Sequence, residues 1–271
     1  MEFDISDDEF EKFQTFLFQE AGIRLSSTKK TLVIARLSRR LKQLGFTNFT
    51  QYYSHIHGVG AANEKRTVLD LLTTNETHFF REIRHFQFLE EIAANEQRGA
   101  TPFRVWSAAS STGEEAYSIA MTLNYHFRFR RWEILASDIS HTVLEIAKAG
   151  EYPVSALEKI PQHFRRHYKL ENQPGKTNTF SIPAEVSRNI RFQHLNLNGN
   201  WPMIGEFDVI FLRNVMIYFD VPTKRKLVTR MIERLRPGGH LFIGHSETLH
   251  GVTDKMEAAK PAVYRIPQQK K

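Results

Sequence analysis

An apolar strand leads directly into a turn of small residues and then into a helix in VWSAASSTGEEAYS, residues 105–118. The turn consists mainly of Ser and Ala, and Gly113 is the only glycine of the segment. Small residues let a ligand approach the backbone just before a helix N-terminus. The glycine-rich GxGxxG pattern of dinucleotide-binding turns is absent. The segment therefore predicts a ligand site at the end of a buried strand.

Strands and helices alternate from Pro102 onward. Expected strands cover 103–109, 132–140, 189–197, 207–214, 238–246 and 262–267, and expected helices cover 113–127, 141–150 and 222–235. This alternation predicts an α/β fold with a doubly wound parallel sheet, which binds its ligands at the carboxyl ends of the strands.

Residues 151–188 interrupt the alternation. We expect a small antiparallel β-insert in this region. Its hairpin is expected to pair HYKL (167–170) with NTFSIPAEV (178–186) around QPGK.

The first 72 residues have the pattern of helices. Ser6 and Glu9 form a capping box, and a second helix is expected over 27–45 with apolar residues at helical spacing. We predict an all-helical N-terminal domain over 1–72. A linker and a further helix are expected over 73–101, followed by the α/β domain over 102–271.

The composition excludes several classes of protein. The chain has 271 residues, a mean hydropathy of −0.42 and no cysteine. Disulfide frameworks, thiolate catalysis and cysteine-ligated metal sites are therefore excluded. The N-terminus lacks the pattern of a signal peptide, and no apolar run is long enough for a membrane span. We expect a cytoplasmic protein.

The charge is unevenly distributed. The formal net charge is +7, yet residues 2–11 carry six acids and residues 21–63 carry seven bases without any acid. Several of the bases lie on one side of the helix expected over 27–45. Two interpretations stay open at this point, because such a face is either merely solvated or docks an acidic partner.

Acidic residues near the small-residue turn indicate the class of ligand. Glu114 and Glu115 at the helix start would repel a pyrophosphate, which argues against NAD and ATP. Asp138 ends the second strand, where an acid accepts hydrogen bonds from ribose hydroxyls. Together these features favour a nucleoside without phosphates, and S-adenosylmethionine fits this description.

The segment FLRNVMIYF (211–219) places Asn214 at a further strand end. Enzymes that methylate nucleic-acid amines often carry Asn/Asp-Pro-Pro-aromatic at this place, whereas this chain has Asn-Val-Met-Ile-Tyr. The difference counts against methylation of bases despite the positive charge.

The motifs TTNETHFFR (73–81), SAASSTGEEAYSIA, ASDIS, RNVMIYF and LFIGHSE, in this order and spacing, resemble the chemotaxis receptor glutamate methyltransferases, the CheR family. The resemblance covers essentially the whole chain. It implies a Rossmann-like S-adenosylmethionine-dependent methyltransferase domain with a small antiparallel β-subdomain, preceded by an all-α domain.

The resemblance also assigns functional residues. It implies that the cofactor is bound by Asn75, Thr77, Arg81, Glu115, Asp138, Asn196, Leu197, Asn214 and Val215. It places Arg81 and Tyr218 on the acceptor side as catalytic residues. No metal is expected, and S-adenosylhomocysteine is the expected product.

The implied substrate is a glutamate in the acidic cytoplasmic helical bundle of a methyl-accepting chemotaxis receptor. The basic helix is then the expected docking surface, through Arg36, Arg39, Arg40 and Lys42. No nucleic acid is expected as a partner, and the membrane is approached only through receptors. A nucleic-acid methyltransferase and a non-catalytic signalling adaptor of the same fold are the alternatives.

Several properties stay open at this stage. The sequence does not name the receptor, the pathway or the oligomeric state. Some family members grip a C-terminal receptor peptide with the β-subdomain. The loop QPGKT (173–177), with Gly175, does not decide whether this chain does so.

Overall fold

The computed structural model describes residues 3–95, 101–127, 131–171 and 178–267. Its N-terminal part contains α1 (Asp7–Ala21), the 3-10 turn η1 (Ser27–Lys29), α2 (Lys30–Leu44), α3 (Phe49–Ile56) and α4 (Ala62–Leu72). The predicted capping box is present, since the Ser6 hydroxyl accepts from the Glu9 amide and the Glu9 carboxylate accepts from the Ser6 amide. The helix expected over 27–45 is also confirmed, and it ends at Gly45 in a left-handed conformation.

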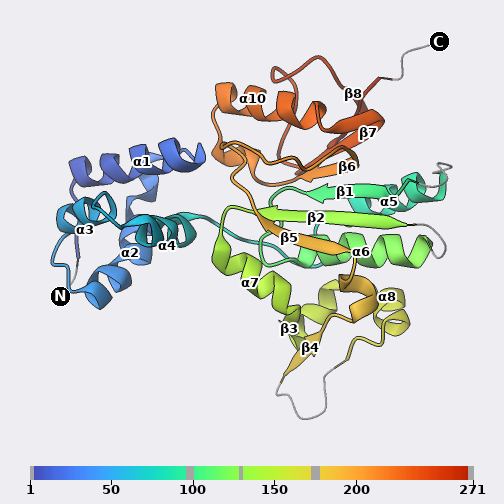
Figure 1. The fold of residues 1–271 in the computed structure, drawn as a ribbon, viewed down its shortest axis with the longest axis horizontal. Helices are drawn as coiled ribbons and strands as arrows, with labels where there is room; N and C mark the ends of the chain where they lie inside the picture. Colours follow the sequence, from blue (N-terminus) through green and yellow to red (C-terminus); the bar gives the residue numbers. More distant parts are fainter. Residues whose placement is uncertain (1–2, 96–100, 128–130, 172–177, 268–271) are drawn as a thin grey trace.

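A separate hydrophobic core holds these helices together. Phe13 and Leu17 of α1 and Leu37 and Leu41 of α2 are fully buried in it. Each such side chain contributes on the order of 1.5–3 kcal/mol through burial. Figure 1 shows this helical domain beside the α/β domain, joined to it by an extended segment.

The α/β domain is built on a seven-stranded sheet with the order β5-β2-β1-β6-β7-β9-β8. The strands are β1 (Phe103–Ser107), β2 (Trp132–Asp138), β5 (Ile190–His194), β6 (Phe207–Leu212), β7 (Leu235–Ile243), β8 (Glu257–Lys260) and β9 (Val263–Arg265). The pairs joining β5, β2, β1, β6 and β7 are parallel, and β9 is antiparallel to β7 and β8. The predicted doubly wound fold is therefore confirmed, with an antiparallel edge.

Helices cover both faces of this sheet: α5 (Arg84–Asn95), α6 (Glu114–His126), α7 (His141–Ala149) and α10 (Val221–Ile232). The strands alternate between the two cores. Val105 of β1 packs into the core that contains α5 and α6, whereas its neighbour Trp106 packs into the core that contains α10. Because β1 pairs with both β2 and β6, the chain winds away from it in both directions, and a crevice forms at the carboxyl ends of these strands.

The insert is antiparallel as predicted, but the predicted hairpin is wrong. The two-stranded sheet pairs β3 (Glu151–Pro153) with β4 (Thr179–Ser181), and η2 (Val154–Lys159), α8 (Gln162–His167) and α9 (Ala184–Ser187) accompany it. In HYKL, Tyr168 and Leu170 alternate like strand residues, yet both are buried just after a helix. The Tyr168 hydroxyl donates to the Met121 carbonyl of α6 at 2.9 Å. The loop QPGKT lies outside the described residues.

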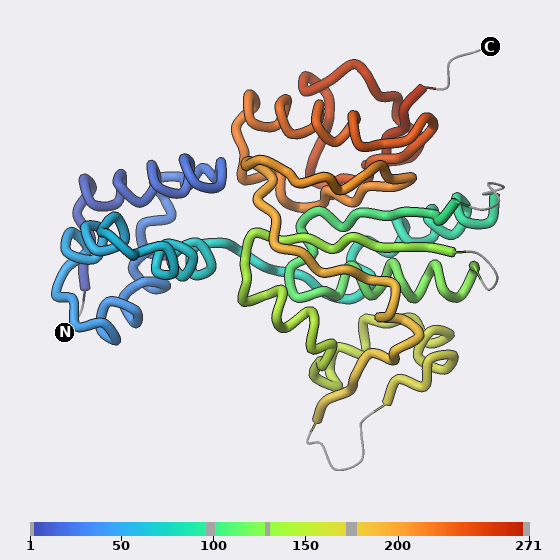
Figure 2. Tube along the Cα trace, in the orientation of Figure 1, coloured from blue at the N-terminus to red at the C-terminus, as the bar shows by residue number. Residues whose placement is uncertain are grey.

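Hydrogen bonds between described residues join the N-terminal domain to the α/β domain. Asp70 accepts from the Thr142 hydroxyl at 2.7 Å. The Asn196 side-chain amide donates to the Glu20 carbonyl at 2.6 Å. The Arg24 amide donates to the Tyr218 carbonyl at 2.8 Å. Figure 2 follows the chain from α4 through the linker into the α/β domain, so the linker passes between the two bodies. Among the described helices, none has the length and apolarity needed to cross a membrane.

Candidate active site

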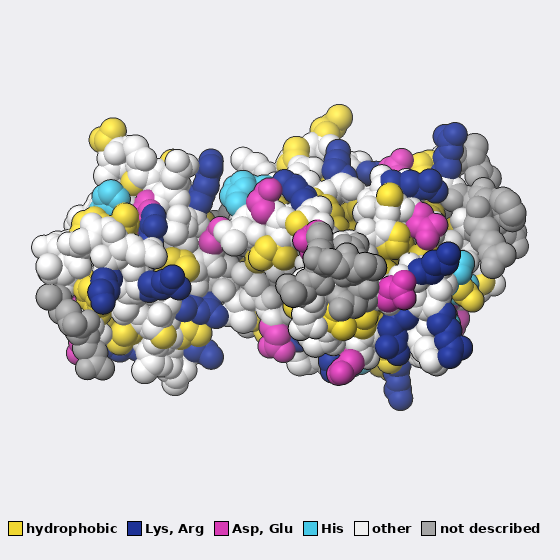
Figure 3. Space-filling view, turned by 90° about the horizontal axis from the view of Figure 1, so that it is seen from below, with side chains coloured by type: hydrophobic (Ala, Val, Ile, Leu, Met, Phe, Trp, Pro, Cys, Tyr) yellow, Lys and Arg dark blue, Asp and Glu magenta, His cyan; other side chains and the backbone are white. Residues whose placement is uncertain are grey.

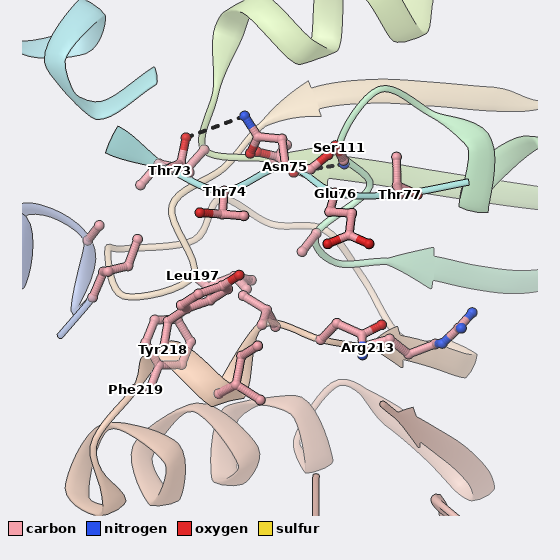
Figure 4. A pocket seen from close by; sticks show the side chains of 18 of the residues that line it. Thr73, Thr74, Asn75, Glu76, Thr77, Ser111, Leu197, Arg213, Tyr218 and Phe219 are labelled. Atoms are coloured by element: carbon pink, nitrogen blue, oxygen red, sulfur yellow. Dashed lines mark hydrogen bonds between the residues drawn. The ribbon is translucent and has the colours of Figure 1, made fainter. Parts of the chain in front are cut away.

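A cavity of about 510 Å³ lies where the linker, the N-terminal domain and the strand ends meet. Figure 4 shows linker residues such as Asn75 on one side and Leu197 and Tyr218 opposite. All residues that the sequence assigned to the cofactor and to catalysis line this cavity: Asn75, Thr77, Arg81, Glu115, Asp138, Asn196, Leu197, Asn214, Val215 and Tyr218. The fold thus gathers side chains that are up to 143 positions apart, from residue 75 to residue 218.

The turn after β1 is shaped by close packing. Gly113 has a φ of +98°, and a Cβ at this position would lie 2.9 Å from the Ala147 Cβ and from the Tyr152 hydroxyl. A side chain is therefore excluded by both conformation and space. This glycine brings the start of α6, which carries Glu115, to the cavity.

Asp138 is fixed at the end of β2 by two backbone amides. Its Oδ2 accepts from the Ser111 N–H at 2.8 Å and its Oδ1 from the Ser140 N–H at 3.0 Å. Burial raises the pKa of Asp138, although these amide donors oppose the effect. A carboxylate oxygen has further lone pairs, so this group can also accept from hydroxyls of a ligand in the cavity.

The linker is held from both sides. The Ser111 hydroxyl donates to the Asn75 carbonyl at 2.8 Å. Arg36 of α2 donates to the carbonyls of Leu72 and Thr73 at 3.0 and 2.8 Å. Arg81 is half-buried and donates through one guanidinium nitrogen to the Glu76 carbonyl at 2.8 Å. The linker backbone therefore forms a defined wall of the cavity.

Sequence reasoning missed a buried ionic network beside this wall. The Arg213 side chain is 1% exposed and lies 3.1 Å from the Glu82 carboxylate and 3.2 Å from the Glu115 carboxylate. It also donates to the Arg81 carbonyl. The network thus connects the linker, the end of β6 and the start of α6. Both missed residues stand within or beside quoted motifs, since Arg213 opens RNVMIYF and Glu82 follows TTNETHFFR.

The two carboxylates respond differently to the same arginine. Burial raises the pKa of Glu115, and Arg213 and the Ser107 hydroxyl only partly offset this effect. Burial acts in the same direction on Glu82, but Arg213 and the His245 amide outweigh it and lower the pKa of Glu82. The two side chains are similarly exposed, but Glu82 also accepts from the His245 amide, whereas the negative charge of Glu82 further raises the pKa of Glu115, and both effects contribute to the difference.

Glu82 also belongs to a group with His85 and His245 whose potential metal-ligating atoms lie within 4.8 Å of one another. Burial lowers the pKa of His85 to about 4, so its ring is neutral. The Glu82 oxygens already accept from Arg213, from the Asn214 side chain and from the His245 amide. Because the Arg213 cation occupies this carboxylate, the geometry favours a hydrogen-bonded network over a metal site.

The expected docking residues fall into two groups. Arg39 and Lys42 are exposed. Arg40 instead forms a bidentate pair with the buried Glu64 at 2.8 and 2.5 Å, and Arg36 holds the linker. The helix therefore does not present all its bases to solvent, because an acid from α4 pairs with one of them. On the face in Figure 3, the charged side chains of the N-terminal lobe, on the left, are still mainly Lys and Arg.

A doubly wound sheet with a cavity at its switch point, an acid at the end of β2 and a turn without a phosphate-binding glycine pattern fit the class of S-adenosylmethionine-dependent methyltransferases. Residues 8–73 match the "CheR methyltransferase, all-alpha domain", and residues 75–264 match the "CheR methyltransferase, SAM binding domain". The chain belongs to the CheR methyltransferase family.

Curated relatives match over nearly their whole lengths. A probable chemotaxis protein methyltransferase of Rhizobium etli is 41% identical over 87% of this chain and 90% of its own. Chemotaxis protein methyltransferase 2 of Pseudomonas aeruginosa is 38% identical over 97% and 94%. The chemotaxis protein methyltransferase of Escherichia coli is 38% identical over 97% and 92%.

Proposed function

We propose that this protein transfers the methyl group of S-adenosylmethionine to glutamate side chains of chemotaxis receptors and forms methyl esters. The observation that carries the proposal is that Asp138 and Arg81 line the same cavity. The names of the relatives, chemotaxis protein methyltransferases, support a receptor as substrate.

In this proposal the cofactor extends across the strand ends. Asp138 accepts from the ribose hydroxyls, and Leu197 and the backbone near Asn196 bracket the adenine. The Asn196 side chain itself makes hydrogen bonds within the protein, since its Nδ2 donates to the Glu20 carbonyl and its Oδ1 accepts from the Asn198 amide. Asn75, Thr77, Glu115, Asn214 and Val215 complete the proposed contacts, and the reaction needs no metal.

The chemistry requires alignment rather than proton transfer. A glutamate carboxylate has an ordinary pKa of about 4.3 and is already an anion at neutral pH. The leaving group is a neutral thioether that departs from a sulfonium. One carboxylate oxygen forms the new bond to the methyl carbon as the carbon–sulfur bond breaks, so neither a general base nor a general acid is needed.

Arg81 is proposed to orient the acceptor carboxylate. One of its nitrogens is held by the Glu76 carbonyl, and the guanidinium offers further donors in a fixed plane. This interaction must stay moderate, because the carboxylate loses its charge on the way to the ester. Tyr218, across the cavity, is proposed to help fix this geometry.

Two alternatives lead to different expectations. A nucleic-acid methyltransferase would methylate RNA or DNA, but Asn-Val-Met-Ile-Tyr at 214–218 argues against it. A non-catalytic adaptor would not bind the cofactor. We further propose that the protein acts in the cytoplasm and that S-adenosylhomocysteine inhibits it as the product.

The test uses Arg81→Ala and the pH dependence of kcat. We expect the variant to lose about 100-fold or more in methylation rate, since an orienting charged contact is removed. We expect kcat of the unmodified enzyme to show no ionisation near pH 7. A sharp loss of kcat that follows a pKa between about 6 and 7 would indicate a general base, and the proposed mechanism would then be abandoned.

A further inference from the structure

The motif LFIGHSE (241–247) ends in an acid whose role the proposed mechanism does not use. Glu247 follows β7 and does not line the cavity. Its carboxylate nevertheless accepts three backbone N–H groups. Oε2 accepts from Asn214 at 2.9 Å and from Gly244 at 2.6 Å, and Oε1 accepts from Ile217 at 3.2 Å. One side chain thus connects the loop after β7 to the segment after β6.

The segment that Glu247 holds forms part of the cavity wall. Asn214, Val215 and Tyr218 line the cavity, and the 3-10 turn η3 spans Met216–Tyr218. Asn214 has a φ of 56°, in the left-handed region that asparagine adopts more readily than most other residues with a side chain. Contacts at its backbone and at its side chain hold Asn214 in this conformation. The bond from the Asn214 amide to Glu247 is one such contact.

Gly244 allows the two loops to approach. A Cβ at this position would lie 2.4 Å from Asn214 Nδ2 and 2.9 Å from Glu247 Oε2. On its other side, Asn214 Nδ2 donates to Glu82 Oε1 at 3.4 Å. Asn214 is therefore held between Glu247 at its backbone and the Glu82–Arg213 network at its side chain.

We propose that Glu247 is a positioning residue, which fixes the 214–218 segment in the conformation that binds the cofactor. This inference rests on the proposed function in one respect, namely that the 214–218 segment binds S-adenosylmethionine. A carboxylate suits the task because both its oxygens accept. A glutamine has only one accepting oxygen, and its amide would place N–H groups against a backbone N–H.

The test compares Glu247→Gln and Glu247→Asp with the matched control Glu257→Gln. Glu257 lies on β8, and its side chain is 46% exposed and pairs with Arg265. The readouts are the Kd of S-adenosylhomocysteine by calorimetry, kcat and KM for S-adenosylmethionine, and the thermal midpoint. We expect Glu247→Gln to weaken binding about tenfold and to raise KM, because charge-assisted bonds to the cavity wall are lost.

Two further variants sharpen the test. Glu247→Asp keeps the carboxylate and should recover part of the affinity. Gly244→Ala keeps the Glu247 carboxylate but crowds both this carboxylate and Asn214, so it should also weaken binding of S-adenosylhomocysteine. Glu257→Gln should bind it like the unmodified protein.

A purely structural role gives a different result. If Glu247→Gln lowers the thermal midpoint but keeps the Kd, KM and kcat at a temperature where it is fully folded, the proposal is overturned. Because the Kd is measured without an acceptor, a protein that binds S-adenosylhomocysteine but methylates no receptor would contradict the proposed function alone.

Discussion

Arg213 lies between two largely buried carboxylates beside the cavity. Its side chain is 1% exposed, and those of Glu82 and Glu115 are 14% and 13% exposed. Without the guanidinium, two neighbouring acids would lose the cation that pairs with both of them. A buried charge that loses its partner is costly, because desolvation is no longer offset. The residue is therefore expected to matter for folding as well as for the shape of the cavity.

We predict that Arg213→Met lowers the free energy of unfolding by about 3–5 kcal/mol. Urea denaturation at neutral pH measures this difference. The control is Arg265→Met, which removes an exposed partner of Glu257 and should cost no more than about 1 kcal/mol. Equal losses in the two variants would show that the buried network adds no special stability.

His85 predicts a pH dependence of stability. Burial lowers its pKa to about 4 in the folded protein, whereas an unfolded histidine has a pKa near 6.5. Between these values the unfolded chain binds a proton that the folded chain does not, so this contribution is complete above about pH 6.5 and decreases as the pH falls towards 4. Protonation of unfolded His85 therefore makes the free energy of unfolding about 2 kcal/mol lower at about pH 5 than above about pH 6.5.

His85→Phe should remove the part of the pH dependence of stability that is due to His85. The unfolding free energies of the variant and of the unmodified protein are compared by urea denaturation at about pH 7.5 and pH 5. The variant should lose about 2 kcal/mol less over this interval. Other groups, including the half-buried His240, contribute to the pH dependence of both proteins and cancel in the comparison. Parallel pH profiles would contradict the assignment.

At the scale of elements, α2 combines two tasks on one helix. Arg40 pairs with the buried Glu64, whose other donor is the Tyr52 hydroxyl at 2.6 Å, and thereby ties α2 to α3 and α4. Arg39 and Lys42 are exposed. Only these exposed bases are suited to a receptor interface without a structural role in the domain.

Reversing both exposed charges, Arg39→Glu with Lys42→Glu, should reduce receptor binding about tenfold and leave the stability within about 0.5 kcal/mol. The matched control, Lys226→Glu, reverses an exposed base on α10 in the other domain. Binding is measured by co-sedimentation with receptor-containing membranes at low and high salt. If the double variant binds as the control does, this face of α2 is merely solvated. Arg40→Glu is unsuitable for the test, because it places an acid against Glu64.

Elements with strong local patterns could be predicted from the sequence. The capped helices and the continuous apolar strands, such as 207–212, occur where expected. β8 was missed because its sequence, EAAK, carries no strand pattern, and it pairs only at the sheet edge. α3 lies within the region predicted to be helical, but its bounds were not predicted, because it is short. The helix expected to reach Leu235 ends at Ile232, and Leu235 instead starts β7, since it pairs with Phe207.

The site residues were predictable where they belong to motifs, but their contacts were not. The resemblance named Arg81 and Asn214, yet no local pattern shows that Arg213 connects Glu82 to Glu115 across 131 and 98 positions. Such pairings depend on the tertiary fold. For the same reason, the sequence did not show that Arg40 pairs with Glu64, which lies 24 positions away on α4.

At the scale of the whole molecule, both domains line the cavity. Ala21 and Ile23 come from the N-terminal domain, Thr73–His78 from the linker, and Asp138 and Tyr218 from the α/β domain. A ligand in this cavity would therefore contact the segment that connects the two bodies. A ligand that binds only the closed state suppresses local opening by a factor of 1 + L/Kd, where L is the concentration of free ligand.

Limited proteolysis tests this coupling. With a protease of broad specificity, saturating S-adenosylhomocysteine should slow cleavage within residues 73–78 by about tenfold or more. Cleavage near the fully exposed Val59, between α3 and α4, serves as the internal control and should not change. Equal protection at both places, or none at the linker, would argue against a ligand seated beside the linker.

The chemical nature of the product tests the central claim most directly. The protein is incubated with S-adenosylmethionine carrying a tritiated methyl group and with membranes that contain one candidate receptor, and the labelled receptor is then treated with mild base. We predict that the label is released as volatile methanol, because a carboxyl methyl ester is hydrolysed under these conditions. Label that withstands base would mean methylation of nitrogen and would contradict a glutamate methyltransferase.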